Sequence, residues 1–311
     1  MCNIWKSPKA AELEPSEYAK LPPTLRTINL TGGEPFLRSD LVEVVKSIHG
    51  IAPTSRIVFS TNGLLKDTIL SVVEQVLGFH RRVGVGVSID GTEATHDKIR
   101  GVLGCYRTAL STVEGLRSIG VRDLRIGMTL TPENLGEAAG VYELSRRLGV
   151  EFTTTFAHNS EVYFQKTDNV SIEAIALKGD ALSSVLRRQL RSASPKDWLR
   201  AYHVGGILDP NLRAEFMGKC EAGQLFFFMS PTGDIFPCTV MNHRIGNIRD
   251  VGSWDELFTP DVQERIAAKA RACREDCWMV CNTRTLILSH PVKAGFWVAR
   301  MKTRAHLNLE T

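Results

Sequence analysis

Cysteine is the residue type with the clearest chemical pattern in this sequence. Five of the seven cysteines fall in the stretch from Cys220 to Cys281. A thiolate is a soft, anionic ligand that binds zinc and the irons of iron–sulfur clusters. We expect a reducing, cytoplasmic location, in which such a group favours metal ligation over disulfide bonds. The pattern therefore predicts a metal centre in the C-terminal part of the chain.

The composition is that of an ordinary globular protein. Hydrophobic residues make up 43% and charged residues 23% of the 311 positions, and the formal net charge is +4. A surplus this small, without a dense run of Lys and Arg, argues against a nucleic-acid partner. The longest purely apolar run, Leu225–Met229, is far too short to cross a bilayer, so we expect no membrane partner.

The first half of the chain alternates between two kinds of segment. Runs rich in β-branched residues precede amphipathic stretches such as 39–50, where Leu41, Val44, Val45 and Ile48 recur at helical spacing. Strands that alternate with helices predict βα units and a parallel sheet. We expect these strands to be apolar on both faces, as in a fully covered sheet. The predicted strands are Thr27–Leu30, Arg56–Phe59, Val83–Ile89, Leu124–Leu130 and Glu151–Phe156.

The pattern changes twice along the chain, so we expect three regions. Residues 1–165 carry five βα units, too few for a closed eight-stranded barrel, which favours an open or partial barrel. Residues 166–215 are helical and polar and are expected to be a connector. Residues 216–311 combine short strands, turns, a predicted helix over 254–272 and the cysteine group. This last region is expected to form a small second domain.

Small and polar residues follow each predicted strand. The strand-end sequences are TGGEP (31–35), STNG (60–63), SIDG (88–91), TLTPEN (129–134) and FAHN (156–159). Ligands bind at the carboxyl ends of parallel strands in both barrels and open sheets. Gly32 and Gly33 allow the backbone to approach a ligand, and the carboxylate of Glu34 suits an ammonium group. Taken alone, this tetrapeptide also fits an ordinary turn.

In combination, four segments resemble the radical S-adenosylmethionine (radical SAM) superfamily: TGGEPFLR, STNG, VSIDG and HDKIRG, the last at 96–101. HDKIRG resembles the branch with a C-terminal auxiliary iron–sulfur domain of the SPASM or twitch type. The resemblance implies an α/β fold: a partial (β/α)6 TIM-like barrel with its first strand missing, followed by a small α+β cysteine-rich domain.

The same resemblance implies an activity. An electron delivered to a 4Fe–4S cluster, by a reductant such as flavodoxin or ferredoxin, cleaves S-adenosylmethionine to a 5′-deoxyadenosyl radical. The radical abstracts a hydrogen atom from a peptide or small-molecule substrate. The cofactor-binding residues implied are Gly32, Gly33 and Glu34 for the amino group, Ser88 and Arg100 for the ribose and carboxylate, and Asn62 and Thr129 at the same rim. A guanidinium suits a carboxylate because it binds it at two points.

The family holds its first cluster with a CxxxCxxC motif, and this sequence has no such triplet. Cys2 lies twenty-nine residues before Thr31, close to the usual distance of the last cysteine of that motif from TGGEP. We therefore expect Cys2 to be a remaining ligand, Met1 to be an internal methionine, and the first strand and two cysteines to lie upstream. As written, the chain has an incomplete ligand set for this cluster. If Met1 is the true start, the alternative is a non-enzymatic iron–sulfur or zinc protein for binding or electron transfer.

The spacing of Cys220, Gly233 and Cys238 resembles the start of an auxiliary-cluster domain. Two strands joined by a turn at Gly233 are expected to bring these two cysteines together. One 4Fe–4S cluster fits five cysteines better than two clusters do. Its expected ligands are Cys220, Cys238, Cys277 and Cys281, with Cys273 as a spare or a substitute. Zinc is the rival occupant, because four thiolates also form a structural zinc site. Cys277 and Cys281 would share a face if their segment were helical.

Two residues limit these expectations. Relatives that oxidise a peptidyl serine or cysteine carry an aspartate directly after the second of these cysteines, whereas this chain has Thr239. That difference argues against the peptidyl-oxidising subgroup. Cys105 stands alone in the sequence and is expected to be a packed thiol.

Overall fold

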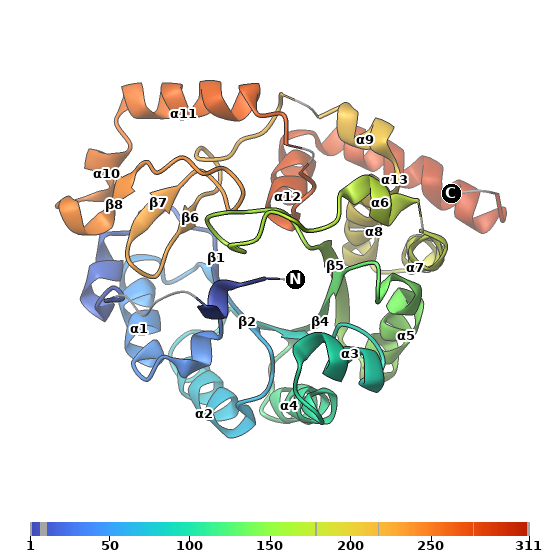
Figure 1. The fold of residues 1–311 in the computed structure, drawn as a ribbon. Coiled ribbons are helices and arrows are strands. Elements are labelled where there is room, and N and C mark those ends of the chain that lie inside the picture. The colour runs from blue at the N-terminus through green and yellow to red at the C-terminus, as the bar shows by residue number, and fades with distance from the viewer. Residues whose placement is uncertain (1, 7–10, 178, 217, 276, 310–311) are drawn as a thin grey trace.

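The computed structural model describes residues 2–6, 11–177, 179–216, 218–275 and 277–309. Its central element is a parallel sheet in the order β1-β2-β3-β4-β5, so that each strand pairs with the next one along the chain (Figure 1). The strands are β1 (Thr27–Leu30), β2 (Arg56–Thr61), β3 (Val83–Ser88), β4 (Asp123–Leu130) and β5 (Glu151–Phe156). The predicted runs are confirmed as strands, and the sheet has the α/β arrangement of a partial TIM-like barrel.

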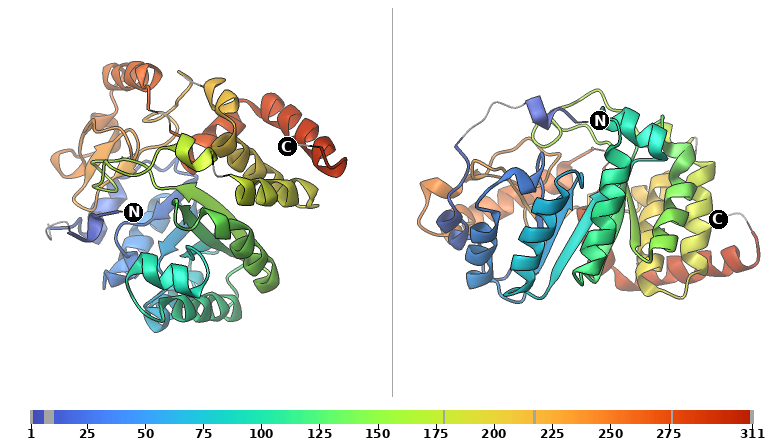
Figure 2. Two further views of the ribbon diagram at one scale, coloured as in Figure 1. Left: turned by 45° about the vertical axis from the view of Figure 1, so that its right-hand side comes forward. Right: turned by 90° about the horizontal axis from the view of Figure 1, so that it is seen from below.

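Helices cover the outer face of this sheet, as Figure 2 shows from below. They are α1 (Leu41–Ile51), α2 (Lys66–Leu77), α4 (Cys105–Ser118) and α5 (Ala138–Leu148), whereas α3 (Glu93–Arg100) lies at the carboxyl end of β3. In α1 the side chains of Val44, Val45 and Ile48 are buried, which confirms the helical spacing predicted for that stretch. Burial of such an apolar stripe, rather than intrinsic helix propensity, supplies most of the stability of a helix of this length.

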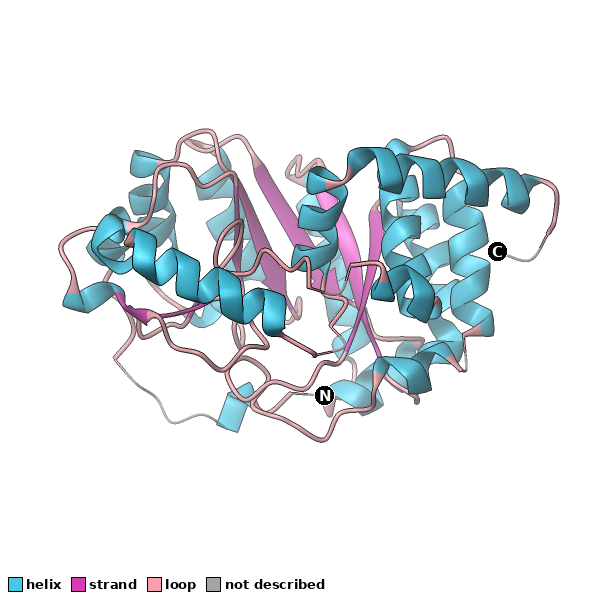
Figure 3. Ribbon diagram, turned by 90° about the horizontal axis from the view of Figure 1, so that it is seen from above, coloured by secondary structure: helices cyan, strands magenta, loops and turns pink. Residues whose placement is uncertain are grey.

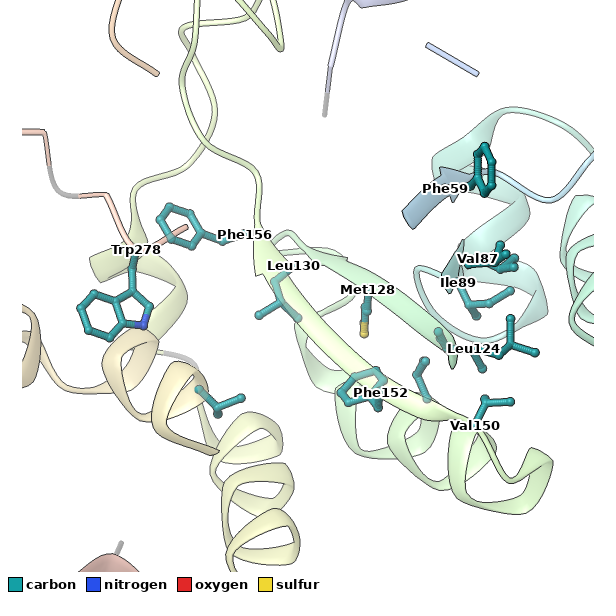
Figure 4. Close-up of a cluster of buried hydrophobic side chains, with 14 of the residues drawn as sticks. Phe59, Val87, Ile89, Leu124, Met128, Leu130, Val150, Phe152, Phe156 and Trp278 are labelled. Carbon is teal, nitrogen blue, oxygen red and sulfur yellow. The ribbon is translucent and has the colours of Figure 1, made fainter. Parts of the chain in front are cut away.

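The inner face of the sheet is polar, and on this point the expectation of two apolar faces is wrong. In β4, Leu124, Ile126 and Met128 are buried in the apolar core, whereas Arg125 and Gly127 line a cavity. Side chains alternate between the two faces of a strand, so a curved sheet that surrounds an open space needs only one apolar face. Figure 4 shows part of the core on the other face, including Leu124 and Met128.

The C-terminal part contains a small antiparallel sheet in the order β6-β7-β8, which lies apart from the large sheet in Figure 3. Its strands are β6 (Phe228–Met229), β7 (Asp234–Phe236) and β8 (Gly246–Asn247), and the expected turn at Gly233 joins the first two. The helix predicted over 254–272 is two helices, α10 (Trp254–Leu257) and α11 (Pro260–Ala272). The break precedes Pro260 because a residue before proline is disfavoured in helical conformation.

The remaining helices connect the two sheets and flank β5. They are α6 (Ile172–Ala176), α7 (Asp180–Arg191), α8 (Pro195–Leu208), α9 (Pro210–Ala214), α12 (Val280–Ser289) and α13 (Pro291–His306). In Figure 1, α12 lies between β1 and β5, at the open side of the sheet. Accordingly, Arg284 of α12 lines the same cavity as Asn29 of β1 and Thr155 of β5. No helix within the described ranges has the length and apolar character that a membrane span requires.

Two buried histidines lie where β5, α8 and α12 meet. His203 Nδ1 bonds Thr283 Oγ1 (3.0 Å), and its Nε2 bonds the carbonyl oxygen of Thr154 (3.0 Å). The ring of His158 lies 3.7 Å from that of Phe156, centroid to centroid, and its Nε2 has no hydrogen-bond partner among the described residues. Burial lowers the pKa of His158 to about 3 and that of His203 to about 4. Both imidazoles are therefore neutral in the folded protein at pH 5.

This burial predicts loss of stability in mild acid. The unfolded chain protonates both imidazoles near pH 6.5. Stability is therefore complete above that pH and is lost as the pH falls toward the folded pKa values. Two extra protons on unfolding correspond to a slope of roughly 2.7 kcal/mol per pH unit between about pH 6 and 4. Urea unfolding at a series of pH values measures this slope.

A matched pair of variants tests the assignment. His203→Gln should reduce the slope to about half, because unfolding then takes up one proton instead of two. His306→Gln, at an exposed histidine near the end of α13, should leave the slope unchanged. Equal slopes in all three proteins would contradict the assignment.

Candidate functional site

The carboxyl ends of the first four strands meet at one edge of the sheet. Because the strands are parallel and pair in sequence order, the segments after them lie side by side. Of the predicted residues, Gly32, Gly33, Glu34 and Ser88 line the cavity at this edge. Gly32 has φ of 132°, a conformation that residues with a side chain rarely adopt, which explains a glycine there.

Glu34 is fixed by hydrogen bonds to the end of β2. Thr61 Oγ1 donates to Glu34 Oε1 (2.8 Å), and the backbone N–H of Asn62 donates to Oε2 (2.8 Å). A weaker bond comes from the N–H of Phe36 (3.4 Å). Burial raises the pKa of Glu34, while these bonds and the nearby charge of Arg100 act in the opposite direction. A carboxylate has about four acceptor positions, so one remains for a ligand donor.

A buried carboxylate positions Arg100. Asp90 follows β3 and is completely buried, and its Oδ2 accepts from Arg100 Nε (2.8 Å) and Nη2 (2.5 Å). Its other oxygen, Oδ1, accepts from the backbone N–H of Thr129 (2.9 Å). Asp90 uses only part of the five-donor guanidinium, and the Arg100 side chain is 26% exposed. Donors of Arg100 therefore remain for an anionic ligand group.

The end of β4 is tied into the same network by Asn134. Its Nδ2 donates to the carbonyl oxygens of Asp90 (2.9 Å) and Thr129 (2.8 Å), and its Oδ1 accepts from the N–H of Thr131 (2.8 Å). Asn134 is fully buried. His96 completes the turn after β3, because its Nδ1 accepts from the N–H of Asp90 (2.9 Å). The network places Thr129 by its backbone, and its side chain makes no hydrogen bond to another described residue.

Two further predicted residues occupy this edge in different ways. Asn62 Oδ1 accepts from the N–H of Leu64 (2.8 Å), so its side chain shapes the turn after β2. Ser88 ends β3 and pairs in register with Gly127, which leaves its hydroxyl facing the cavity. No hydrogen bond of Ser88 to another described side chain is present.

Cys2 lies at the same edge, against the segment that follows β5. The backbone N–H of Asn3 donates to the carbonyl oxygen of Phe164 (2.8 Å). Next to it, the hydroxyl of Tyr163 bonds Thr31 Oγ1 (3.0 Å), directly before the Gly-Gly pair. Burial raises the pKa of Tyr163, and the nearby thiol of Cys2 adds to this effect. The chain thus places Cys2 close to the start of TGGEP, although twenty-eight residues separate them.

The C-terminal thiols form a second group. Burial raises the pKa of Cys220 to about 11 and that of Cys281 to about 12, and it raises the pKa of Cys277 well above its usual range. Each of these three thiols lies close enough to Cys238 for Cys238 to contribute to its raised pKa. Cys273 has the same effect on Cys220 and Cys238. These mutual effects place the five C-terminal cysteines near one another.

The detail of this group differs from the expectation in one respect. Helix α12 begins at Val280, so Cys277 precedes it and does not share a helical face with Cys281. Cys238 accepts hydrogen bonds at Sγ from the N–H groups of Val240 (3.4 Å) and Met241 (3.1 Å), as an anionic sulfur would. Among the described residues, no three His, Cys, Asp or Glu side chains surround a single metal-ion position.

Cys105 lies outside both groups. It is buried, and its Sγ donates to Asp97 Oδ1 (3.2 Å). Burial and this carboxylate raise the pKa of Cys105 to about 11. This is the environment of a packed thiol, as expected from the sequence.

The segment after β5 touches both sites. Ser160 Oγ donates to the carbonyl oxygen of Thr239, directly after Cys238, and Asn242 Nδ2 donates to Glu161 Oε2 (2.5 Å). The ring of Tyr163, which bonds the strand-end site, also lies edge-on to Phe228 at 5.4 Å between centroids. A cavity of about 3480 Å³ extends between the sites. Its lining includes residues of both, among them Gly33, Glu34, Ser88, Cys238 and Cys281.

Comparison with known proteins assigns a family to the part of the chain that contains the first site. Residues 5–145 match the family model described as "Radical SAM superfamily". They form a radical SAM domain. The matched range contains the strand-end residues of β1 to β4 and ends before β5. The expected likeness to the radical SAM superfamily is therefore confirmed for this part of the chain.

Curated relatives of this chain carry different names. It is 30% identical over 232 residues to the AdoMet-dependent heme synthase of Methanosarcina barkeri, covering 71% of this chain and 65% of that protein. It is 27% identical over 246 residues to a mycofactocin maturase of Mycolicibacterium smegmatis, covering 74% of this chain and 57% of that protein. The chain thus spans roughly three fifths of the length of these relatives. Both relatives are named as enzymes.

A solved structure shares the fold of this chain. The crystal structure of Streptococcus suis SuiB bound to S-adenosylmethionine matches with a TM-score of 0.56 at 13% sequence identity. The match covers 78% of this chain and 56% of that one. It supports the α/β architecture and is too distant in sequence to assign residues.

The strand-end site contains residues that the sequence analysis did not single out. Asn134 ties the end of β4 to Asp90, and Tyr163 joins Thr31 to the segment after β5. A signal existed for Asp90, since it lies ten residues before Arg100 at a strand end. Tyr163 had none, because its contact with Thr31 joins segments 132 residues apart.

The buried Asp90–Arg100 pair makes a stability prediction. Asp90→Asn should lower the free energy of unfolding by roughly 3 kcal/mol, because Arg100 loses a charged partner in a largely buried place. Urea unfolding followed by circular dichroism measures the change. Glu93→Gln is the control, since it breaks an exposed pair with Arg107 (2.6 Å) and should cost less than about 1 kcal/mol. Similar losses in both variants would show that Asp90 does not hold Arg100 as described.

Proposed function

We propose that this chain is a radical SAM enzyme that binds S-adenosylmethionine at the carboxyl ends of β1–β4 and holds one auxiliary 4Fe–4S cluster. The observation that carries the proposal is the position of Glu34, which lines the cavity, close to the Asp90–Arg100 pair at the carboxyl edge of the sheet. Cys2 lies at the same edge, and Cys281 lines the same cavity. In this proposal, residues 1–165 carry the barrel, 166–215 connect, and 216–311 hold the auxiliary cluster.

The strand-end residues suit the polar groups of S-adenosylmethionine. The remaining acceptor position of Glu34 would receive the ammonium group, beside the open backbone of Gly32 and Gly33. The free donors of Arg100 would bind the carboxylate as a charge-assisted pair. The hydroxyl of Ser88 faces the cavity and would reach the ribose. Asn62 and Thr129 would position these groups through the turn and the backbone.

The first cluster needs three thiolates, and Cys2 would supply one of them. In this proposal Cys2 is the last residue of a CxxxCxxC motif, whose other cysteines occupy the second and sixth positions before residue 1. When bound, the cluster and S-adenosylmethionine supply reductive cleavage to a 5′-deoxyadenosyl radical. The chain itself binds, orients and shields these groups from water. Tyr163, held by Thr31, would cover Cys2.

The auxiliary cluster would be held by Cys220, Cys238, Cys277 and Cys281, with Cys273 close enough to replace one of them. Raised thiol pKa values describe the metal-free group, and a bound metal reverses them by stabilising the thiolates. The N–H donors at Cys238 Sγ stabilise that thiolate in either state.

The substrate would be a peptide or a small molecule that enters the cavity. The relatives are named for heme synthesis and for mycofactocin maturation, so their names alone do not select one class. The electron would come from a cytoplasmic reductant such as a flavodoxin or ferredoxin.

The proposal predicts an effect of Glu34→Gln in a protein extended upstream by the CxxxCxxC motif and reconstituted without oxygen. Replacing the carboxylate by an amide removes the charge and places donors against Thr61 and Asn62. Binding of S-adenosylmethionine should weaken by about ten- to hundredfold, which corresponds to one hydrogen bond to a charged group. Equilibrium binding and formation of 5′-deoxyadenosine under reduction measure the effect.

Glu43→Gln serves as the matched control, because Glu43 lies exposed on α1 with Lys46 (3.6 Å) and should have no effect. Failure of the extended, reconstituted wild-type protein to form 5′-deoxyadenosine would refute the enzymatic proposal. In that case a single iron–sulfur or zinc centre in a binding or electron-transfer protein would remain.

Metal analysis tests the auxiliary cluster separately. Anaerobic reconstitution of residues 1–311 should give about four irons and four sulfides per chain at the C-terminal group. Cys277→Ala and Cys281→Ala should each lose most of this iron, whereas Cys105→Ala should retain it. Retention of the iron in Cys273→Ala would show that Cys273 is not one of the four ligands. Zinc without sulfide in the purified protein would overturn the iron–sulfur assignment.

A further inference from the structure

Five cationic side chains gather inside the cavity, toward the amino ends of the strands. This basic cluster lies at the opposite end of the sheet from the strand-end site. All five side chains line the cavity. The charges of Arg56 and Arg200 act on Arg125, that of Arg56 acts on Arg284, and Lys196 shares the carboxylate of Glu151 with Arg200. They are Arg56 of β2, Arg125 of β4, Lys196 and Arg200 of α8, and Arg284 of α12.

The acidic side chains in contact with the basic cluster do not neutralise its positive charge. Asp123 pairs with Arg56, and Glu151 pairs with both Lys196 (2.7 Å) and Arg200. A further carboxylate, Asp197, reaches Arg200 from outside the cavity lining, at 3.6 Å. Even with it, five cations meet three carboxylates. The cluster therefore carries a net positive charge.

Arg125 and Arg284 account for this excess. Among the described residues, neither guanidinium has a carboxylate within 4 Å or a hydrogen-bond partner. Burial lowers the pKa of Arg125 to about 10, with repulsion from Arg56 and Arg200 adding to the effect, and burial together with Arg56 lowers that of Arg284. Both remain charged at neutral pH. Arg125 is half-buried in the cavity wall, and Arg284 is exposed. A partly desolvated cation without a close partner is costly, so an anion bound beside Arg125 would stabilise this arrangement.

The sheet makes room for Arg125. Strand β3 reads Val-Gly-Val-Gly-Val-Ser, with the valines buried and the glycines on the inner face. A Cβ atom at Gly86 would lie 3.0 Å from Arg125 Nε, and one at Gly84 would lie 2.7 Å from Asp123 Oδ2. The side chains of β4 thus lie across the bare backbone of β3. Arg125 occupies a defined place in the cavity wall.

The distance to the strand-end site sets the size of a ligand that would join the two. Arg125 and Thr129 are four residues apart on β4, which corresponds to roughly 13 Å along a strand. A molecule bound at Arg125 would therefore reach the site of hydrogen abstraction if it were on the order of 10 Å long. The cavity of about 3480 Å³ has ample room for such a molecule.

We propose that Arg125 and Arg284 bind the anionic groups of the substrate, carboxylates or phosphates, and so anchor it at the amino ends of the strands. Guanidinium groups bind both kinds of oxyanion at two points. That the bound anion belongs to the substrate rests on the proposed function. Anion binding itself depends only on the residues of this cavity.

Isothermal titration of residues 1–311 in the absence of S-adenosylmethionine tests the site, with propane-1,2,3-tricarboxylate and inorganic pyrophosphate as probes. At least one probe should bind, and Arg125→Met and Arg284→Met should each weaken it by about ten- to hundredfold. Arg125→Lys keeps the positive charge and should therefore lose less affinity for the probe than Arg125→Met. Arg300→Met, at an exposed position of α13, should bind like the wild type. The tighter probe distinguishes a carboxylate from a phosphate substrate.

Two outcomes would overturn the proposal: no binding of either probe at millimolar concentration, or equal binding by the wild type and both methionine variants. Circular dichroism confirms folding of each variant, and Arg284→Met, on the surface of α12 that faces the cavity, tests the site even if Arg125→Met fails to fold. Because the readout needs neither cluster nor cofactor, its failure is distinct from failure of 5′-deoxyadenosine formation.

Discussion

The ion pair between Asp90 and Arg100 is the interaction on which the strand-end site depends. A carboxylate without exposure to water is stable only when its charge and its hydrogen bonds are satisfied, and Arg100 and the N–H of Thr129 satisfy it. One side chain thereby fixes the end of β3, the end of β4 and the last turn of α3. The same pair holds a guanidinium at the carboxyl edge of the sheet without saturating its donors.

The two sites are coupled through the segment that follows β5. Tyr163 bonds Thr31 at the strand-end site and contacts Phe228 beside the small sheet, and Ser160 bonds the residue after Cys238. One short, hydrogen-bonded stretch of chain therefore contacts both the strand-end site and the C-terminal cysteine group.

Much of the fold could be predicted from the sequence because strands and amphipathic helices have local periodicity. The strands and α1 follow directly from such patterns. The polar inner face was missed because Gly86 and Arg125 are single residues within otherwise apolar runs. Only the curvature of the sheet shows that they face a cavity. The position of Cys277 before α12 was missed for a related reason, since i, i+4 spacing indicates a shared face only inside a helix. Contacts such as Tyr163–Thr31 depend on tertiary structure and have no local pattern. Which residues bind S-adenosylmethionine stays a prediction.

Because valine and glycine alternate in β3, substitutions that alter the core and substitutions that alter the cavity wall fall on different residues of this strand. The valines belong to the core, and the glycines leave the chamber wall at that strand without side chains. Enlarging either glycine would narrow the chamber and displace a charge of β4, far from the edge where Glu34 and Arg100 lie. The range of molecules that fit could therefore drift in a lineage by small steps in β3, while the residues at the opposite edge stay the same.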